Sequence, residues 1–134
     1  MFKITIYGQA PSINSLYRIG KDGNLYLTRT GKTYKAAVRE ILSAQLIKLP
    51  SELRGKPLKA TFRWWFIHLW ERNGNPVRRD YDGPIKIVQD ALAEALKFDD
   101  CWIFEANVEK RKGGREKSVV TLEPYTLQPC EDDE

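Results

Sequence analysis

Four stretches of the chain have the pattern or composition of β-strands. Apolar and polar residues alternate over residues 2–7, and residues 59–70 are rich in aromatic and β-branched side chains, which predicts a strand buried on at least one face. Residues 103–112 and 117–123 are two further predicted strands. The Gly113–Gly114 pair lies between them, so the sequence predicts that these two strands form a hairpin.

Another segment repeats its apolar residues at helical spacing. Thr30 or Thr33 is expected to cap this first helix, which should run to about Leu49 and stop before Pro50. Residues 19–27, before the helix, are expected to form two short extended pieces around a turn. The apolar stripe of the helix consists of Ala37, Val38, Ile41, Leu42 and Leu46.

A second helix is predicted from Pro84 to about Lys97, with Asp82 as its N-cap. Its apolar stripe consists of Ile85, Val88, Leu92, Ala95 and Leu96. Lys86 and Asp90 follow Asp82 at intervals of four residues, on another face of the helix. We interpret Asp90 as a partner in a surface salt bridge, whereas Lys86 is a candidate for chemistry because it neighbours a pair of acids.

The predicted order of elements is β-(β)-α-β-α-β-β, which places the chain in the α/β (α+β) class. We expect a single-layer mixed sheet with two main helices on it. Residues 1–125 are predicted to form one domain, as the length of 134 residues suggests. Residues 126–134 are acidic and are expected to be a disordered tail.

The charge of the chain is more basic than its total of +4 indicates. The last four residues are all acidic, so the rest of the chain carries 22 basic and 14 acidic side chains, a net charge of +8. A basic body favours an anionic partner. The two cysteines lack metal-ligand spacing, which predicts reduced thiols and a cytoplasmic location. No apolar run has the length of a membrane span, so no membrane association is expected.

The most informative segment runs from Arg78 to Asp100. Asp80 and Asp82 are two residues apart, and in an extended chain such side chains point the same way, toward one hard cation. Mg²⁺ prefers a few carboxylates together with waters and a substrate phosphate. Basic residues are interleaved with the acids, which suits a polyanionic substrate. The segment therefore predicts a metal-dependent phosphodiester site, with a second acidic pair, Asp99–Asp100, after the helix.

This combination of residues resembles the RusA family of Holliday-junction resolvases, which phages and prophages often carry. The shared pattern is D-x-D at Asp80 and Asp82, then Lys86, Asp90 and the Asp99–Asp100 pair. Two further segments are similar to family motifs: Pro11-Ser12-Ile13-Asn14 with Tyr17, and Gly31-Lys32-Thr33-Tyr34. The resemblance spans residues 2–125. It departs at Gly83, where many members of the family have asparagine.

The resemblance implies a role for each of these residues. Asp80, Asp82 and Asp100 would bind Mg²⁺ or Mn²⁺, with Asp99 as an auxiliary ligand, and no other cofactor is expected. Lys86 would contact the scissile phosphate. The substrate would be branched DNA, a four-way junction, held mainly through its phosphates. The residues expected to bind DNA are Arg18, Arg78, Arg79, Lys86, Lys110, Arg111, Lys112 and Arg115, with Lys21 and Lys117 as further candidates.

The length of the second helix suggests a homodimer. From Pro84 to Lys97 it would be roughly 20 Å long, so Asp82 and Asp100 would lie near its opposite ends. Two antiparallel helices across a twofold axis would place Asp82 of one chain beside Asp100 of its partner. The sequence therefore predicts active sites that are shared between two chains, with Trp102 to Phe104 or the helix itself as the apolar contact.

Two other functions are compatible with parts of the pattern. A catalytically silent dimer of the same fold could bind DNA junctions, and the glycine at position 83 favours it weakly. A sugar-nucleotide enzyme could use D-x-D with Mn²⁺, but then the basic cluster has no purpose. No Ser-His-Asp set is available, because His68 is the only histidine. His68, Trp64, Trp65 and Trp70 are all expected to be packed residues of a strand.

Overall fold

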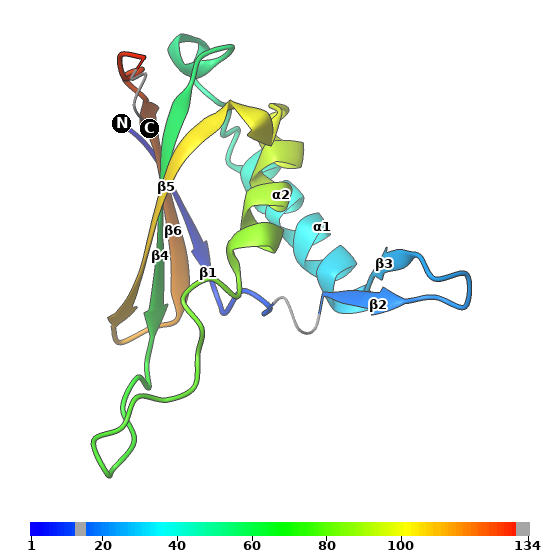
Figure 1. The fold of residues 1–134 in the computed structure, drawn as a ribbon, viewed down its shortest axis with the longest axis vertical. Coiled ribbons are helices and arrows are strands. Elements are labelled where there is room, and N and C mark those ends of the chain that lie inside the picture. The colour runs from blue at the N-terminus through cyan, green and yellow to red at the C-terminus, as the bar shows by residue number, and fades with distance from the viewer. Residues whose placement is uncertain (13–15, 131–134) are drawn as a thin grey trace.

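Four strands form a mixed sheet, and both α-helices cover the same face of it (Figure 1). The computed structural model describes residues 1–12 and 16–130. The mixed four-stranded sheet with two helices on one face confirms the predicted α/β (α+β) class. The elements are β1 (Phe2–Tyr7), β2 (Tyr17–Ile19), β3 (Leu25–Leu27), α1 (Arg29–Ala44), η2 (Ser51–Leu53), β4 (Leu58–Phe66), α2 (Ile85–Leu96), η3 (Asp100–Trp102), β5 (Ile103–Lys112) and β6 (Lys117–Pro124).

The strand order in the sheet is β1-β6-β4-β5, with β4 parallel to β5 and antiparallel to β6. The predicted hairpin is therefore wrong, because β4 lies between β5 and β6. The loop that joins them passes the end of β4, where Gly113 N donates to Phe66 O at 3.0 Å. Hydrophobicity explains the order. Alternate residues of β4 are buried along its whole length, so it takes a central position, whereas β5 is largely exposed and forms an edge.

Helix α1 begins and ends earlier than predicted. Thr28 is its N-cap and accepts a hydrogen bond from Gly31 N at 3.3 Å, so neither predicted cap is correct. The helix ends at Ala44, because Leu46 has a positive φ of 55° that breaks helical geometry. Leu46 was predicted to lie in the apolar stripe but is 82% exposed.

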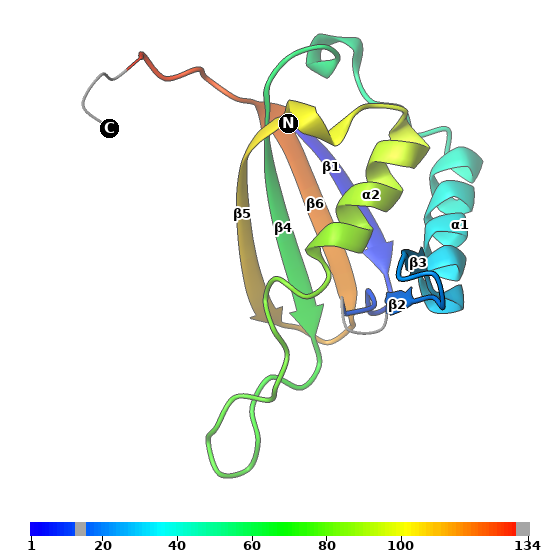
Figure 2. The same cartoon turned by 45° about the vertical axis from the view of Figure 1, so that its right-hand side comes forward.

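Helix α2 packs against both the sheet and α1 (Figure 2). Its buried face is consequently broader than the predicted stripe: Ile87 and Ala91 are buried, while Ile85 and Ala95 are only partly buried. Pro84 occupies the N-cap position and no side chain caps the helix, so the predicted cap by Asp82 is wrong.

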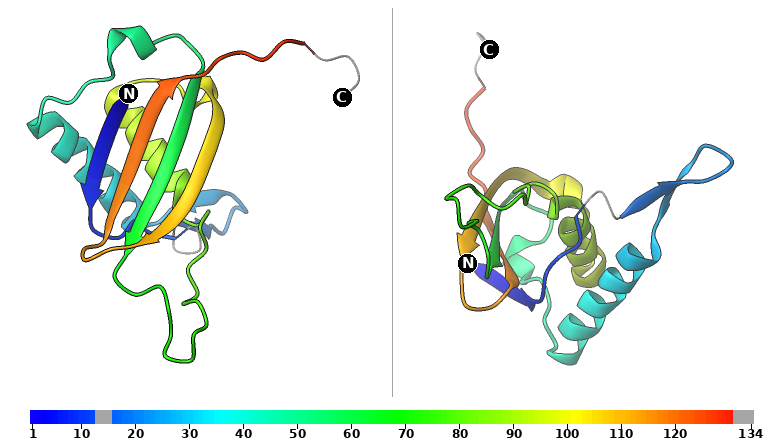
Figure 3. Two further views of the ribbon diagram at one scale, coloured as in Figure 1. Left: turned by 90° about the vertical axis from the view of Figure 1, so that its left-hand side faces the viewer. Right: turned by 90° about the horizontal axis from the view of Figure 1, so that it is seen from below.

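Two segments project from the body of the molecule (Figures 1 and 3). The first is the arm formed by β2 and β3, which confirms the predicted pair of extended pieces. The second follows β4, which ends at Phe66 and not at the predicted residue 70. His68 is exposed, and Trp70 is 61% exposed and forms a β-bridge with Pro76. Their predicted packing in a strand is therefore wrong, although Trp64 is buried as expected.

The described part of the C-terminal segment leaves the sheet beyond Pro124 without regular structure (Figure 2). The acidic residues 131–134 and the Ile13–Asn14 part of the family motif lie outside the described residues. Cys101 and Cys130 are both free and exposed. Within the described ranges, none of the helices has the length and apolar character needed to cross a membrane.

Candidate functional site

Asp80 and Asp82 lie in a turn that leads into α2. Gly83 N donates to Asp80 O at 3.3 Å, and Ile85 N donates to Asp82 O at 3.2 Å. The expectation of an extended D-x-D segment is therefore wrong, because these hydrogen bonds curl the backbone. Both side chains are exposed, and neither carboxylate forms a hydrogen bond or ion pair with any described residue. Both are thus accessible to a cation from solution.

The sheet fixes the backbone of this turn from two strands. Trp64 on β4 is 2% exposed, and its Nε1 donates to Tyr81 O at 2.6 Å. Lys110 on β5 donates from Nζ to Arg79 O at 2.8 Å. The carbonyl groups on either side of Asp80 are therefore both held by side chains of the sheet. Lys110, predicted to contact a phosphate, is directed at this backbone.

The N-terminal segment meets the turn at Gly83. This glycine is buried, and a Cβ at its position would lie 3.4 Å from Ser12 Oγ and 3.5 Å from Asp80 O. Both are ordinary van der Waals distances, so position 83 has room for the first carbon of a side chain such as asparagine. The Pro11–Ser12 segment therefore lies against the turn, although the two are far apart in sequence.

A cleft of about 610 Å³ opens beside the turn. Arg79 lies along one wall, with its guanidinium carbon 4.8 Å from the centroid of the Phe66 ring. Gln9 accepts a hydrogen bond from Arg79 Nη1 at 2.6 Å when its amide is oriented to satisfy both of its polar atoms. Two arginines against one aspartate make the cleft suitable for a phosphate. The lining residues are Gln9, Ala10, Ser12, Phe66, Arg78, Arg79, Asp80, Gly83 and Pro84.

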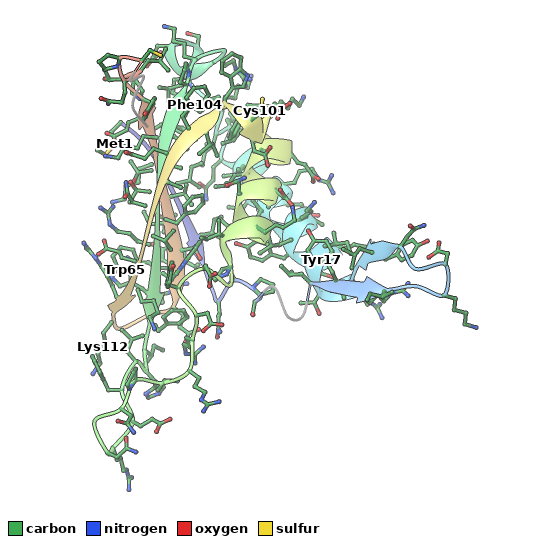
Figure 4. All side chains as sticks on the ribbon, in the orientation of Figure 1. Met1, Tyr17, Trp65, Cys101, Phe104 and Lys112 are labelled. Atoms are coloured by element: carbon green, nitrogen blue, oxygen red, sulfur yellow. The ribbon has the colours of Figure 1, made fainter. Side chains whose placement is uncertain are left out.

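Lys86 belongs to a second group of polar residues, along α2. Its Nζ lies 3.4 Å from Asp90 Oδ2 and 6.0 Å from the centroid of the Tyr17 ring, which is labelled in Figure 4. The Asp90 carboxylate raises the pKa of Lys86, with smaller contributions from Tyr17 and Asp100. Lys86 is therefore a firmly charged ammonium that is directed forward along the helix. Asp90 forms the expected salt bridge.

The acidic pair after α2 divides into two different environments. Asp99 caps η3, because its Oδ1 accepts from Cys101 N at 2.9 Å, and this hydrogen bond lowers the pKa of Asp99. Asp100 is half-buried, and its Oδ2 accepts from Gln89 Nε2 at 3.1 Å. Local capping therefore accounts for Asp99, while Asp100 faces the same helix as Lys86.

Asp100 reaches back along α2 and does not point away from the far end of the helix. Helix α2 has 12 residues and is about 18 Å long, but Asp100 contacts Gln89 in its first half because η3 turns back along it. In the parts of the chain that the structure describes, however, no three acidic, histidine or cysteine side chains come close enough to hold a metal ion. The acids therefore form two groups, before α2 and beside it.

The residues predicted to bind DNA are distributed over both faces of the sheet and over the arm. Arg78 and Arg79 line the cleft, and Lys86 is on α2. Arg18 lies on the arm, with its guanidinium carbon 5.4 Å from the centroid of the Tyr26 ring. Arg111 lies on the face of the sheet opposite the helices, beside Trp65 in the register of the strands. Arg115 lies over the ring of Tyr7, at the same end of the sheet. Lys112 ends β5 and is exposed, as Figure 4 shows.

Sequence reasoning missed three residues that shape the site. Gln9 contacts Arg79 although the two residues are 70 positions apart, and no local sequence pattern predicts such a contact. Trp64 was assigned only to the core, although a buried indole N–H requires an acceptor. Gln89 lies one turn after Lys86 on the polar side of α2, so its position in the helical repeat was a usable signal.

Replacing Asp90 with asparagine should lower the pKa of Lys86. The carboxylate is the largest cause of the raised pKa, so its removal destabilises the protonated form and Lys86 loses its proton at lower pH. NMR titration of the lysine side chains would measure the change. Glu94→Gln removes the same charge from the same helix and should leave Lys86 unaltered, since Glu94 pairs with Lys35. An unchanged Lys86 titration in Asp90→Asn would contradict this pairing.

Accessible carboxylates beside an arginine-lined cleft, on a sheet that fixes their backbone, form a site whose charges suit the phosphate groups of a polyanion. The chain belongs to the RusA endodeoxyribonuclease family, whose sequence model matches residues 9–123. A search of curated proteins finds no match.

Proposed function

We propose that the chain is a metal-dependent endonuclease that resolves four-way DNA junctions, in recombination or repair of DNA. The observation that carries this proposal is the exposed Asp80–Asp82 turn at the edge of the arginine-lined cleft. Membership of an endodeoxyribonuclease family supports the type of reaction. The position of the turn supports the division of labour: acids for a cation, arginines for phosphates.

The residues of the turn fit a hard divalent ion. Asp80 and Asp82 offer carboxylate oxygens, the ligands that Mg²⁺ and Mn²⁺ prefer, and neither is engaged by a described residue. A bound Mg²⁺ polarises a phosphoryl oxygen and lowers the pKa of a bound water. Asp100 would complete the acid set. Asp99 is the weaker candidate, because it already caps η3.

The remaining side chains would position the substrate. Arg79 is stacked on Phe66 and restrained by Gln9, so its guanidinium is preorganised to bind a phosphate of the strand to be cut. Lys86 would stabilise negative charge that develops on the scissile phosphate, because its ammonium remains protonated. For this role Lys86 must exchange the Asp90 carboxylate for the phosphate.

We also propose that the chain acts as a homodimer with shared sites. The separation of the acids into two groups within one chain supports this arrangement, because a second chain could bring its Asp100 to the Asp80–Asp82 turn. A four-way junction is cut on two opposed strands, so a twofold dimer matches the symmetry of the substrate.

A cleavage assay tests the proposed function. Four-way, three-way and linear duplex DNA are incubated with the chain and Mg²⁺, and products are resolved on denaturing gels. Nicking should occur on the four-way junction, require the metal and stop with EDTA. Binding without nicking in Mg²⁺ and in Mn²⁺ would instead identify the catalytically silent junction-binding dimer.

A further inference from the structure

The open face of the sheet carries a row of alternating aromatic and basic side chains. Leu58, Ala60, Phe62, Trp64 and Phe66 of β4 are buried beneath the helices, so Trp65 faces the other way. Figure 3, left, shows that no described helix covers this face. The register places Trp65 beside Lys117 of β6 and Arg111 of β5, and Lys117 beside Tyr7 of β1. The row therefore crosses all four strands.

The aromatic rings hold the basic groups in place. Lys117 Nζ lies 4.9 Å and the guanidinium carbon of Arg111 lies 5.5 Å from the centroid of the Trp65 ring. Arg115, in the loop before β6, lies 3.9 Å above the Tyr7 ring. A cation that stacks on a ring keeps its N–H donors at its edge, free to bind an anion. The three cations are consequently held beside one another, and Arg111 is also paired with Glu109 at 2.8 Å.

The charges on this face are unevenly distributed. Toward the other end of the sheet, Lys59 pairs with Glu105 at 3.3 Å and with Glu123 at 3.9 Å. Glu109 accepts from both Arg63 and Arg111, at 2.6 and 2.8 Å. In the described portion of the chain, neither Arg115 nor Lys117 forms an ion pair. The excess positive charge therefore gathers at the end of the face that carries the row.

This row lies on the opposite side of the sheet from the candidate site. Neighbouring residues of β5 show the division: Lys110 points to the helix side and bonds to Arg79 O, while Arg111 lies against Trp65. In Figure 4, Trp65 is on the side of the sheet away from the helices, whereas Tyr17 lies on the helix side. One DNA backbone in the cleft could not follow both surfaces without wrapping around the edge of the sheet.

We propose that Arg111, Arg115 and Lys117, supported by Tyr7 and Trp65, form a second binding surface for the phosphate backbone of duplex DNA. The inference rests on the proposed function, and it adds that the chain grips a second arm of the junction on the back of the sheet. Three inter-strand spacings make the row about 14 Å long, enough for several phosphates of one strand, which advance about 3.4 Å each along the duplex axis. The row has more cations than unpaired acids, so its charge is complementary to the negatively charged backbone of DNA.

The test compares two triple variants by DNA binding. One is Arg111→Gln with Arg115→Gln and Lys117→Gln. The other, Arg39→Gln with Lys48→Gln and Lys56→Gln, removes the same charge from exposed basic residues that are not part of the sheet. Binding of a fluorescent four-way junction is measured by anisotropy in EDTA over a series of salt concentrations. The row variant should bind roughly tenfold or more weakly, and its log–log salt slope should fall by about one unit for each lost phosphate contact.

Further variants and outcomes keep the proposal open to refutation. If the triple variant does not fold, Arg115→Gln alone should lower the slope by about one unit. Tyr7→Leu with Trp65→Leu keeps every charge, yet should weaken binding because the cations lose their support. If the row variant and the control variant have equal log–log salt slopes, the proposal is overturned. The row would then be a candidate surface for binding an acidic protein. A wild-type chain that binds junctions but never nicks them would refute the proposed function and leave this inference intact; one that binds no DNA would refute both.

Discussion

Replacing Asp82 with asparagine should abolish junction nicking and leave junction binding at least as tight as before. A divalent ion supplies several kcal/mol of charge stabilisation, so losing one of its ligands should slow cleavage by about a thousandfold. Asp82 is exposed and only its backbone takes part in the turn, so the fold should survive. Removing a negative charge beside the cleft also reduces repulsion of the phosphates.

Single-turnover nicking and anisotropy binding of the same protein would measure both effects. Glu40→Gln is the matched control, because it removes one exposed carboxylate from α1, away from the turn. Thermal unfolding of all three proteins would verify that the fold is retained. Nicking by Asp82→Asn at the wild-type rate would exclude this carboxylate as a metal ligand.

Mixing inactive Asp82→Asn protein with inactive Asp100→Asn protein should restore nicking. In a mixed dimer with shared sites, one site carries both defects and the other carries neither. One strand of the junction should then be cut, without the paired cut of resolution. If each site lies within one chain, both sites of the mixed dimer are defective and no nicking returns.

The experiment requires evidence that the chains exchange. Mass spectrometry of differently tagged chains would show the mixed dimer directly. A mixture of two tagged Asp82→Asn preparations is the control and should stay inert. A confirmed mixed dimer without nicking would refute shared sites, as would a chain that sedimentation shows to be monomeric at assay concentrations.

The strands and helices could be predicted because each depends on a pattern of neighbouring residues. Alternation identified β1, and aromatic and β-branched composition identified β4. The glycine pair marked off β5 and β6, and helical spacing identified α1 and α2. The strand order was not predictable in the same way. Gly113 and Gly114 indicate that the chain reverses between β5 and β6. Only the assembled sheet, in which β4 is buried along one face, shows that β4 lies between these two strands.

The same distinction holds for the candidate site. The spacing of acids and Lys86 pointed to a phosphodiester chemistry, yet it could not show that Asp80 and Asp82 occupy a turn instead of a strand. Nor could it show that Asp100 returns to Gln89, since that depends on the tight η3 turn. Contacts between distant segments, such as Trp64 with Tyr81, need the assembled sheet.

The central position of β6 has a consequence for synthesis of the protein. This strand lies between β1 and β4, although it is the last strand of the sheet in sequence and so is synthesised after the others. The nascent chain can form α1, α2 and the parallel pair β4–β5, but β1 has no partner strand in the sheet until β6 has left the exit tunnel. Pairing of the first strand with the last also raises the contact order, which slows folding. We therefore expect the domain to complete its fold only after β6 has left the exit tunnel, and a chain truncated before β6 to remain a substrate for chaperones and proteases.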